Sequence, residues 1–167
     1  MVSEVHARNA NMVKVVFGSK PAGTQHSDIM DYFLSHQSKY EISSEILVDE
    51  RQPMLNWKMR ALLLDWMMEV SAEFKLRRET FYLGVNYLDR YVLKVPHIHK
   101  RDYQLIGTAA LYLACKMEEI SIPKISYFII ATDRGYSHKQ ILNMERDIAM
   151  ELEWNLTPSS IETWMRL

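Results

Sequence analysis

The sequence of 167 residues has few of the residue types on which disulfide-bonded, metal-bound or glycine-rich folds depend. Its single cysteine, Cys115, excludes an internal disulfide framework and a multi-cysteine zinc site within one chain. Five glycines and five prolines are few for a β-sandwich or a nucleotide-binding α/β fold, because both need turn glycines. These scarcities favour helices, and a chain of this length can bury one core without a disulfide or metal.

The sequence also lacks an excess of one charge and a long apolar run. It has 20 Lys and Arg against 21 Asp and Glu, whereas a nucleic-acid-binding protein is usually strongly basic. No apolar run approaches the roughly 18 residues of a membrane-spanning helix, and residues 12–17 are too few for a signal-peptide core. We therefore expect no membrane partner, no direct nucleic-acid partner, and a soluble protein of the nucleus or of nucleus and cytoplasm.

Motifs of catalysis or metal binding are absent from the sequence. It has no G-x-G-x-x-G, P-loop lysine motif, G-x-S-x-G or H-E-x-x-H. His97 and His99 lie in a proline-containing loop and are predicted to be surface residues. Glu118 and Glu119 are adjacent, so on a helix they point about 100° apart and indicate a solvated or partner-facing helix end. Cys115 lies in an apolar segment and is predicted to be a core residue. We expect no enzyme activity, no catalytic residue, no cofactor and no metal.

Composition and hydrophobic periodicity divide the chain into four parts. Residues 1–26 are predicted to form a flexible tail, and residues 27–52 a short N-terminal helix with a linker. Residues 53–157 carry the periodic pattern of a helical bundle. Residues 158–167 are interpreted as the stub of a missing second helical domain, because a helix of barely two turns is unstable alone.

Helical periodicity within residues 53–157 predicts an all-α fold of five helices, over about 53–75, 79–93, 100–119, 123–134 and 137–152. The third has no charged residue between Leu105 and Cys115, and small side chains alternate with large ones there. A helix that is apolar on all sides belongs in the middle of a bundle. Ser137 and Gln140 have the spacing of a capping box, which predicts the start of the fifth helix.

Several segments, in order along the chain, resemble the cyclin box. They are Met59–Trp66, Glu79–Leu83, Asn86–Tyr91, Gln104–Ala110 and Lys116–Ile120 followed by Pro123. The family's five hallmark positions are matched by Arg60, Asp89, Leu105, Lys116 and Glu145. The resemblance runs from about Asp28 to Pro158 and is greatest to E-type cyclins, with A-type close behind. It implies a five-helix cyclin box around a buried central helix, preceded by a short N-terminal helix, with the second box of the family absent.

The resemblance implies a regulatory subunit that binds and activates a cyclin-dependent protein kinase for cell-cycle progression, at G1/S by subtype. The implied kinase-binding residues are Lys116, Glu118, Glu145, Leu113, Met117, Ala149 and Trp154. From the residues alone, Lys116 could equally complement its own helix C-terminus, and Glu145 could lie on a solvated helix face. The resemblance also implies that Arg60 and Asp89 form a structural ion pair between the first two helices of the box.

A second surface implied by the resemblance is a groove that takes an Arg-x-Leu segment of substrates or inhibitors. Its residues would be Met59, Leu62, Trp66, Glu69, Tyr103 and Gln104. Leu63, Met67 and Val70 on the same helix are predicted to be core. Two positions depart from the family pattern, since Tyr103 stands where leucine is usual and Ala131 where a larger aliphatic residue is usual.

Two other readings of the same fold stay open at this point. A truncated cyclin-like protein would bind a kinase without activating it. A scaffold of the transcription-initiation-factor type would contact DNA, but it should be strongly basic and should lack the Lys116 and Glu145 pair.

Overall fold

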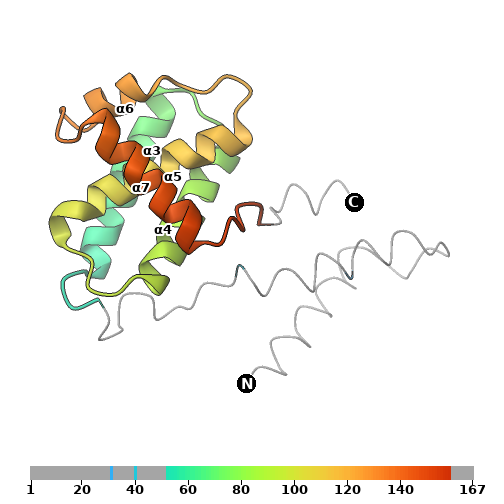
Figure 1. The fold of residues 1–167 in the computed structure, drawn as a ribbon. Helices are drawn as coiled ribbons and strands as arrows, with labels where there is room; N and C mark the ends of the chain where they lie inside the picture. Colours follow the sequence, from blue (N-terminus) through green and yellow to red (C-terminus); the bar gives the residue numbers. More distant parts are fainter. Residues whose placement is uncertain (1–30, 32–39, 41–51, 159–167) are drawn as a thin grey trace. The chain divides into compact units, whose positions relative to one another are not determined.

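The computed structural model describes Asp31, Tyr40 and residues 52–158 (Figure 1). The described elements are α3 (Trp57–Glu73), α4 (Arg78–Lys94), α5 (Lys100–Glu118), α6 (Ile125–Ala131) and α7 (His138–Glu151). Residues 52–158 contain no strand, which confirms the prediction of an all-α bundle. The predicted tail lies outside the described residues, and so do the predicted N-terminal helix and linker apart from Asp31, Tyr40 and Gln52, and the predicted C-terminal stub apart from Pro158.

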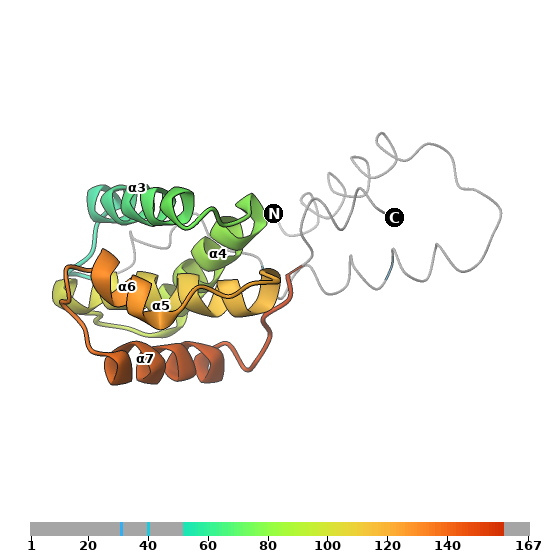
Figure 2. The same cartoon turned by 90° about the horizontal axis from the view of Figure 1, so that it is seen from above.

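Helix α5 is the centre of the bundle, as its sequence predicts. Figure 2 shows it between α3 on one side and α7 on the other. Residues 105–111 and 113–115 of α5 are all buried. The apolar residues of α3 divide as expected, since Leu63, Met67 and Val70 point into the core.

Two glycines allow neighbouring helices to approach α5 closely. A Cβ atom on Gly107 would lie 3.0 Å from Cδ1 of Leu63 on α3. A Cβ atom on Gly84 of α4 would lie 3.2 Å from the Cα atom of Leu111. Both distances are shorter than ordinary carbon contacts, so a larger residue would push the helices apart.

The start of α3 differs from the prediction. We expected Pro53 in the first helical turn, but α3 begins at Trp57. Asn56 is the N-cap, and its side-chain oxygen accepts a hydrogen bond from the Met59 amide at 2.9 Å. The preceding residues form a turn, in which the Leu55 amide donates to the Gln52 carbonyl at 3.1 Å. The side chain of an asparagine N-cap satisfies one of the first amides of a helix, which have no partner within the helix itself.

Of the two predictions near the α6–α7 connection, the capping box is confirmed, whereas the predicted end of α6 was too late. Helix α6 ends at Ala131 rather than just before Gly135, because Asp133 and Arg134 adopt left-handed φ angles of 50° and 57°. The capping box of α7 is confirmed: the Ser137 hydroxyl accepts from the Gln140 amide at 3.3 Å, and the Gln140 side chain accepts from the Ser137 amide at 2.9 Å.

Gln52 joins the segment before α3 to the α4–α5 connection. Its buried side-chain amide donates to the carbonyls of Val92 and Val95 at 2.6 and 2.5 Å. Its side-chain oxygen accepts from the Ile98 amide at 3.1 Å. Three hydrogen bonds to the backbone therefore hold the C-terminal end of α4 and the loop that leads to α5.

Candidate functional site

Lys116 at the end of α5 and Glu145 on α7 form an ion pair. The Nζ atom of Lys116 lies 2.7 and 2.9 Å from the two carboxylate oxygens of Glu145. The same Nζ lies 4.5 Å from the centroid of the Tyr112 ring. The Lys116 side chain keeps 35% of its surface exposed, while that of Glu145 keeps 11%. Glu145 therefore does not lie on a solvated face, and the pair is a charged element at the rim of an apolar core.

The other residues predicted to bind a kinase differ in their exposure. Met117 on α5 and Trp154 in the turn after α7 are exposed, Trp154 by 69%. Leu113 and Ala149 are buried, so the structure corrects the expectation that they offer contact surface. Both are part of the hydrophobic core to which α5 and α7 contribute.

The two glutamates at the end of α5 are fixed by the start of α4. Arg77 Nη1 donates to the Glu118 carboxylate at 3.3 Å. The Glu119 carboxylate accepts from the Arg77 amide at 2.8 Å and from the Thr80 hydroxyl at 2.5 Å. Glu119 therefore satisfies donors at the N-terminus of α4, where a carboxylate is favoured. The sequence reading of a merely solvated or partner-facing helix end missed this structural role, because the bond partners lie 39 and 42 residues away.

Three residues of one face of α4 hold the backbone that follows α7. Arg90 Nη1 donates to the Asn155 carbonyl at 2.8 Å, and Lys94 Nζ donates to the Glu151 carbonyl at 2.8 Å. The Tyr87 hydroxyl donates to the carbonyl of Leu156. This set of bonds fixes the turn that carries Trp154, whose φ angle of 57° is left-handed. The spacing of Tyr87, Arg90 and Lys94 at i, i+3 and i+7 places them on one face of a helix, and this was the only sign in the sequence that they act together.

Lys94 also makes an ion pair within the same turn. Its Nζ lies 2.7 Å from a carboxylate oxygen of Glu153. The hydrogen bond and the positive charge of Lys94 lower the pKa of Glu153 below its ordinary value. The turn before Trp154 is thus held by charge as well as by backbone hydrogen bonds.

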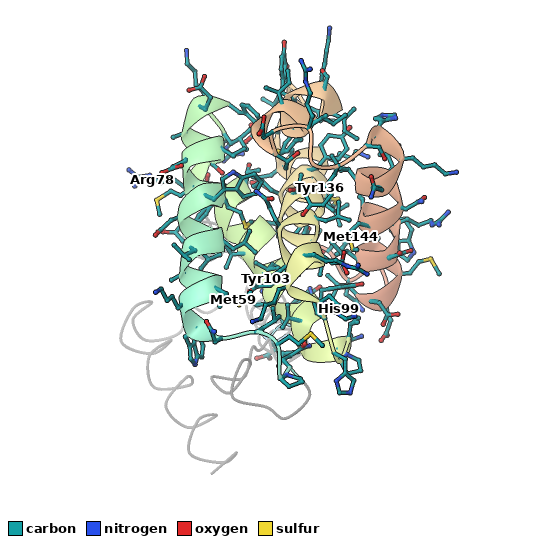
Figure 3. The ribbon with its side chains drawn as sticks, turned by 90° about the vertical axis from the view of Figure 1, so that its left-hand side faces the viewer. Met59, Arg78, His99, Tyr103, Tyr136 and Met144 are labelled. Atoms are coloured by element: carbon teal, nitrogen blue, oxygen red, sulfur yellow. The ribbon has the colours of Figure 1, made fainter. Side chains whose placement is uncertain are left out.

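The outer face of α3 carries the residues predicted to form a docking groove. Leu62 exposes 61% of its surface, Glu69 is exposed, and Met59 and Trp66 are half-buried against the core. Gln104 of α5 is half-buried and its carbonyl accepts from the Thr108 hydroxyl at 2.7 Å. Figure 3 shows Met59 and Tyr103 on the same face of the bundle. Leu62 and Glu69 are therefore accessible to a partner, and Met59, Trp66 and Gln104 are partly accessible.

Tyr103 differs from the other predicted groove residues. Only 3% of its surface is exposed, and its buried hydroxyl has no hydrogen-bond partner among the described residues. Burial and the nearby Asp89 carboxylate raise its pKa above the ordinary value. Tyr103 is therefore part of the core beneath the groove, which corrects the expectation that it lies on the docking surface. Ala131 is half-buried at the end of α6.

Arg60 and Asp89 form the predicted ion pair between α3 and α4. Arg60 donates from Nε and Nη2 to the two oxygens of Asp89, at 2.9 and 2.7 Å. The bidentate bond to Asp89 raises the pKa of Arg60. The guanidinium also lies 5.6 Å from the centroid of the Trp57 ring. The pair is a structural link with a planar, two-point geometry.

The described residues offer little to catalytic or metal chemistry. Within residues 52–158 no group of three His, Cys, Asp or Glu side chains is arranged to hold a metal ion. Burial raises the pKa of Cys115 to about 12, so its thiol is protonated near neutral pH and behaves as a core side chain. Among the described helices, none is both long and apolar enough to cross a bilayer.

The described helices form an all-helical domain around the buried α5. Residues 28–157 match the family model described as the cyclin N-terminal domain, which is most of the chain. The chain belongs to the cyclin family, and it is most similar to the E-type G1/S cyclins.

Curated relatives agree with this assignment. The chain is 47% identical over 120 residues to "G1/S-specific cyclin-E1" of Danio rerio, which covers 72% of this chain and 29% of that protein. It is 45% identical over 116 residues to "G1/S-specific cyclin-E" of Drosophila melanogaster, covering 70% and 16%. It is 44% identical over 108 residues to "G2/mitotic-specific cyclin S13-7" of Glycine max, covering 65% and 42%. The chain therefore spans less than half the length of each of these relatives.

A solved structure supports the fold. The chain matches the X-ray structure of a viral cyclin from herpesvirus saimiri with a TM-score of 0.67 and 23% sequence identity. The match covers 77% of this chain and 55% of the viral chain. It confirms the all-α cyclin-box fold that the sequence predicts.

Proposed function

We propose that this chain is a regulatory subunit that binds and activates a cyclin-dependent protein kinase in the control of cell-cycle progression, at the G1/S step. The chain itself would have no enzyme activity. Such a kinase holds its phosphate-transfer groups but lacks the correct Lys–Glu pairing until its regulatory helix is placed. An activator must bind that active arrangement more tightly than the inactive one.

The observation that carries the proposal is the ion pair of Lys116 and Glu145, which joins α5 to α7 with a fixed geometry. Two exposed apolar side chains accompany it, Met117 next to Lys116 on α5 and Trp154 in the turn after α7. Lysine offers donors to backbone carbonyls and the carboxylate offers an acceptor to backbone amides, so the pair suits the end or edge of a partner's helix. Glu118 lies beside it, held by Arg77.

The test measures phosphate transfer to a histone-type substrate by a monomeric cyclin-dependent kinase, with and without the chain. Stimulation by the unchanged chain, and its loss in a Lys116→Ala, Glu145→Ala variant, is the expected result. The matched control is Arg101→Ala, Asp102→Ala, which removes an exposed pair 3.7 Å apart at the other end of α5. Circular dichroism checks that both variants fold.

Two results would contradict the proposal, each in its own way. Kinase binding without stimulation would make the chain a competitor that occupies the kinase without activating it. An absence of binding to every such kinase, from a correctly folded chain, would leave the cyclin fold without the proposed function.

We further propose that Met59, Leu62, Trp66, Glu69 and Gln104 bind Arg-x-Leu segments of substrates and inhibitors. Leucine would occupy the apolar part of this surface and arginine would meet Glu69. Fluorescence anisotropy with a labelled Arg-x-Leu peptide tests the surface, with Leu62→Ala expected to weaken binding and Ile130→Ala, another exposed apolar residue, expected not to. Equal affinity of both variants would contradict it.

We propose a nuclear location, or one shared between nucleus and cytoplasm, in keeping with the proposed role in cell-cycle progression. Imaging of a fluorescent fusion tests this, and exclusion from the nucleus would contradict it.

A further inference from the structure

Helix α3 carries a second apolar stripe, of which Leu64 packs against the core while the other residues are exposed, and none belongs to the predicted groove. The stripe consists of Trp57, Ala61, Leu64, Met68 and Ala72, which recur at i, i+4, i+7, i+11 and i+15. Trp57 and Met68 expose 46% and 53% of their surfaces, Ala61 and Ala72 are exposed, and Leu64 is half-buried. An apolar row on an outer helix that includes an exposed tryptophan is typical of a protein interface.

No described helix covers this stripe. Figure 2 shows α3 at one edge of the bundle, with α5 on its inner side. The core residues Leu63, Met67 and Val70 occupy that inner side, so the stripe lies on a different part of the α3 surface. The groove residues Met59, Leu62 and Trp66 belong to yet another row of α3, separated from the stripe by a row of charged residues.

We propose that the occupant of the stripe is the same stripe of a second copy of the chain, packed antiparallel about a two-fold axis. Four of the five stripe residues pair across the point midway between Leu64 and Asp65, each large residue with a small one, and Leu64 adjoins that point. An antiparallel partner centred there places Trp57 over Ala72 of the second copy and Ala61 over Met68 of the second copy. Large side chains then meet small ones at four places, which is the complementarity that close helix packing requires.

Charge supports the antiparallel direction. Lys58, Asp65, Glu69 and Glu73 are exposed and each follows a stripe residue by one position, so they form one flank of the stripe. None of the four makes an ion pair within residues 52–158. In the antiparallel pair this charged flank of one copy faces the same flank of the other. Lys58 then lies at the level between Glu69 and Glu73 of the second copy.

The helix dipole also favours the antiparallel arrangement. The first turn of α3 has no acidic residue and its last turn has no basic one. Lys58 and Glu73 therefore carry the signs that the dipole of their own helix disfavours. A second copy running in the opposite direction would set the start of one α3 beside the end of the other, and would offset both unfavourable placements.

The arrangement contains one repulsive feature. Asp65 adjoins the midpoint, so the two Asp65 carboxylates of the pair lie close together. One helix pair also buries less than a standard protein interface, so we expect weak association, with a Kd on the order of 10–100 μM. The repulsion between the two Asp65 carboxylates predicts that neutralising Asp65 strengthens the dimer, which a non-specific apolar contact would not predict.

Sedimentation equilibrium of the whole chain between about 5 and 300 μM tests the proposal, since this range brackets the expected Kd. Met68→Glu should weaken the dimer by more than about tenfold, because it buries a charge opposite Ala61. Asp65→Asn should tighten it by about threefold, the size of one like-charge pair. Lys58→Glu should weaken it, and Lys58→Glu with Glu69→Lys should restore it. Ile130→Glu, at an exposed apolar site on α6, is the matched control and should leave the Kd unchanged.

A covalent trap provides a second readout. Asp65→Cys should form a disulfide-linked dimer under mild oxidation, since the two positions adjoin the symmetry axis, and Ile130→Cys should not. The native Cys115 is buried and does not compete. A chain that stays monomeric at about 300 μM would overturn the proposal. So would a dimer that Met68→Glu leaves intact, or one that Asp65→Asn weakens. The kinase assay is independent of these measurements.

Discussion

At the scale of single residues, long-range polar pairs decide how the helices are joined. Arg60 and Asp89 are 29 residues apart and meet through two hydrogen bonds. The Asp89 side chain exposes only 5% of its surface, while that of Arg60 keeps 22%. Breaking a buried pair by removing one partner is costly because the remaining charge is stranded. The contribution of this pair is therefore read most clearly from single substitutions.

Asp89→Asn is expected to lower the free energy of unfolding by about 3 kcal/mol, because the Arg60 guanidinium loses its only opposite charge among the described residues. Urea unfolding followed by circular dichroism measures the change. Asp147→Asn, in an exposed pair on α7, is the control and should cost less than about 0.5 kcal/mol. Equal losses in the two variants would show that Arg60 and Asp89 add no more than a surface pair.

Tyr103→Phe is expected to raise the free energy of unfolding by about 1 kcal/mol, because it removes a buried hydroxyl that has no partner among the described residues. Thermal unfolding measures the change, and Tyr82→Phe, at an exposed site on α4, should leave the stability unchanged. A loss of stability in Tyr103→Phe would mean that the hydroxyl is hydrogen-bonded in solution.

At the scale of elements, the bundle depends on how closely α3 and α4 approach α5. Gly107 and Gly84 lie where a Cβ atom would press on Leu63 and on the backbone of Leu111 respectively. Helix propensity alone would favour alanine at both positions by about 1 kcal/mol. The packing distances show why tertiary contacts override this preference.

Gly107→Ala is expected to destabilise the chain by about 1–3 kcal/mol, since the added methyl lies 3.0 Å from the Leu63 side chain. The measurement is a double-mutant cycle with Leu63→Ala, in which urea unfolding gives the stability of each variant. The double variant should lose clearly less than the two single losses combined, because the methyl then fills space that the leucine has left. Additive losses would place the strain elsewhere.

At the scale of the whole molecule, buried neutral groups make the free energy of unfolding depend on pH in the alkaline range. Burial raises the pKa of Tyr87, Tyr91 and Tyr103 above the ordinary tyrosine value, and raises that of Cys115 to about 12. A group with a raised folded-state pKa contributes stability that is present below its unfolded-state pKa. That stability is lost as the pH rises above the unfolded value, since the unfolded chain then releases protons that the folded chain retains.

The free energy of unfolding should therefore fall steadily above about pH 9, where the thiol and then the tyrosines of the unfolded chain begin to ionise. Urea unfolding at intervals between pH 7 and pH 11 measures the slope, and absorbance near 295 nm reports tyrosinate. Tyr103→Phe should reduce the slope, whereas Tyr82→Phe should not. Full tyrosine ionisation in a chain that stays folded would contradict this prediction.

Much of the fold was predictable because local chemistry carries it. The apolar period placed α3, α4, α5 and α7 within a few residues, and the run without charge identified α5 as the central helix. The Ser137 capping box was readable because both partners lie within one turn. The family resemblance identified the Arg60 and Asp89 pair in advance.

Partners distant in the sequence are what only the tertiary structure decided. The sequence gives no sign that Glu119 binds the start of α4, that Gln52 binds the end of α4, or that Lys116 and Glu145 meet each other. The resemblance implies that Tyr103 is a groove residue, yet its side chain is buried in the core. A helix is specified by neighbours three or four positions away, whereas the surface it presents depends on which other helices pack against it. For that reason the sequence by itself determined the helices and the family, and the packed structure decided which charges are paired and which apolar residues of α3 stay uncovered by the described helices.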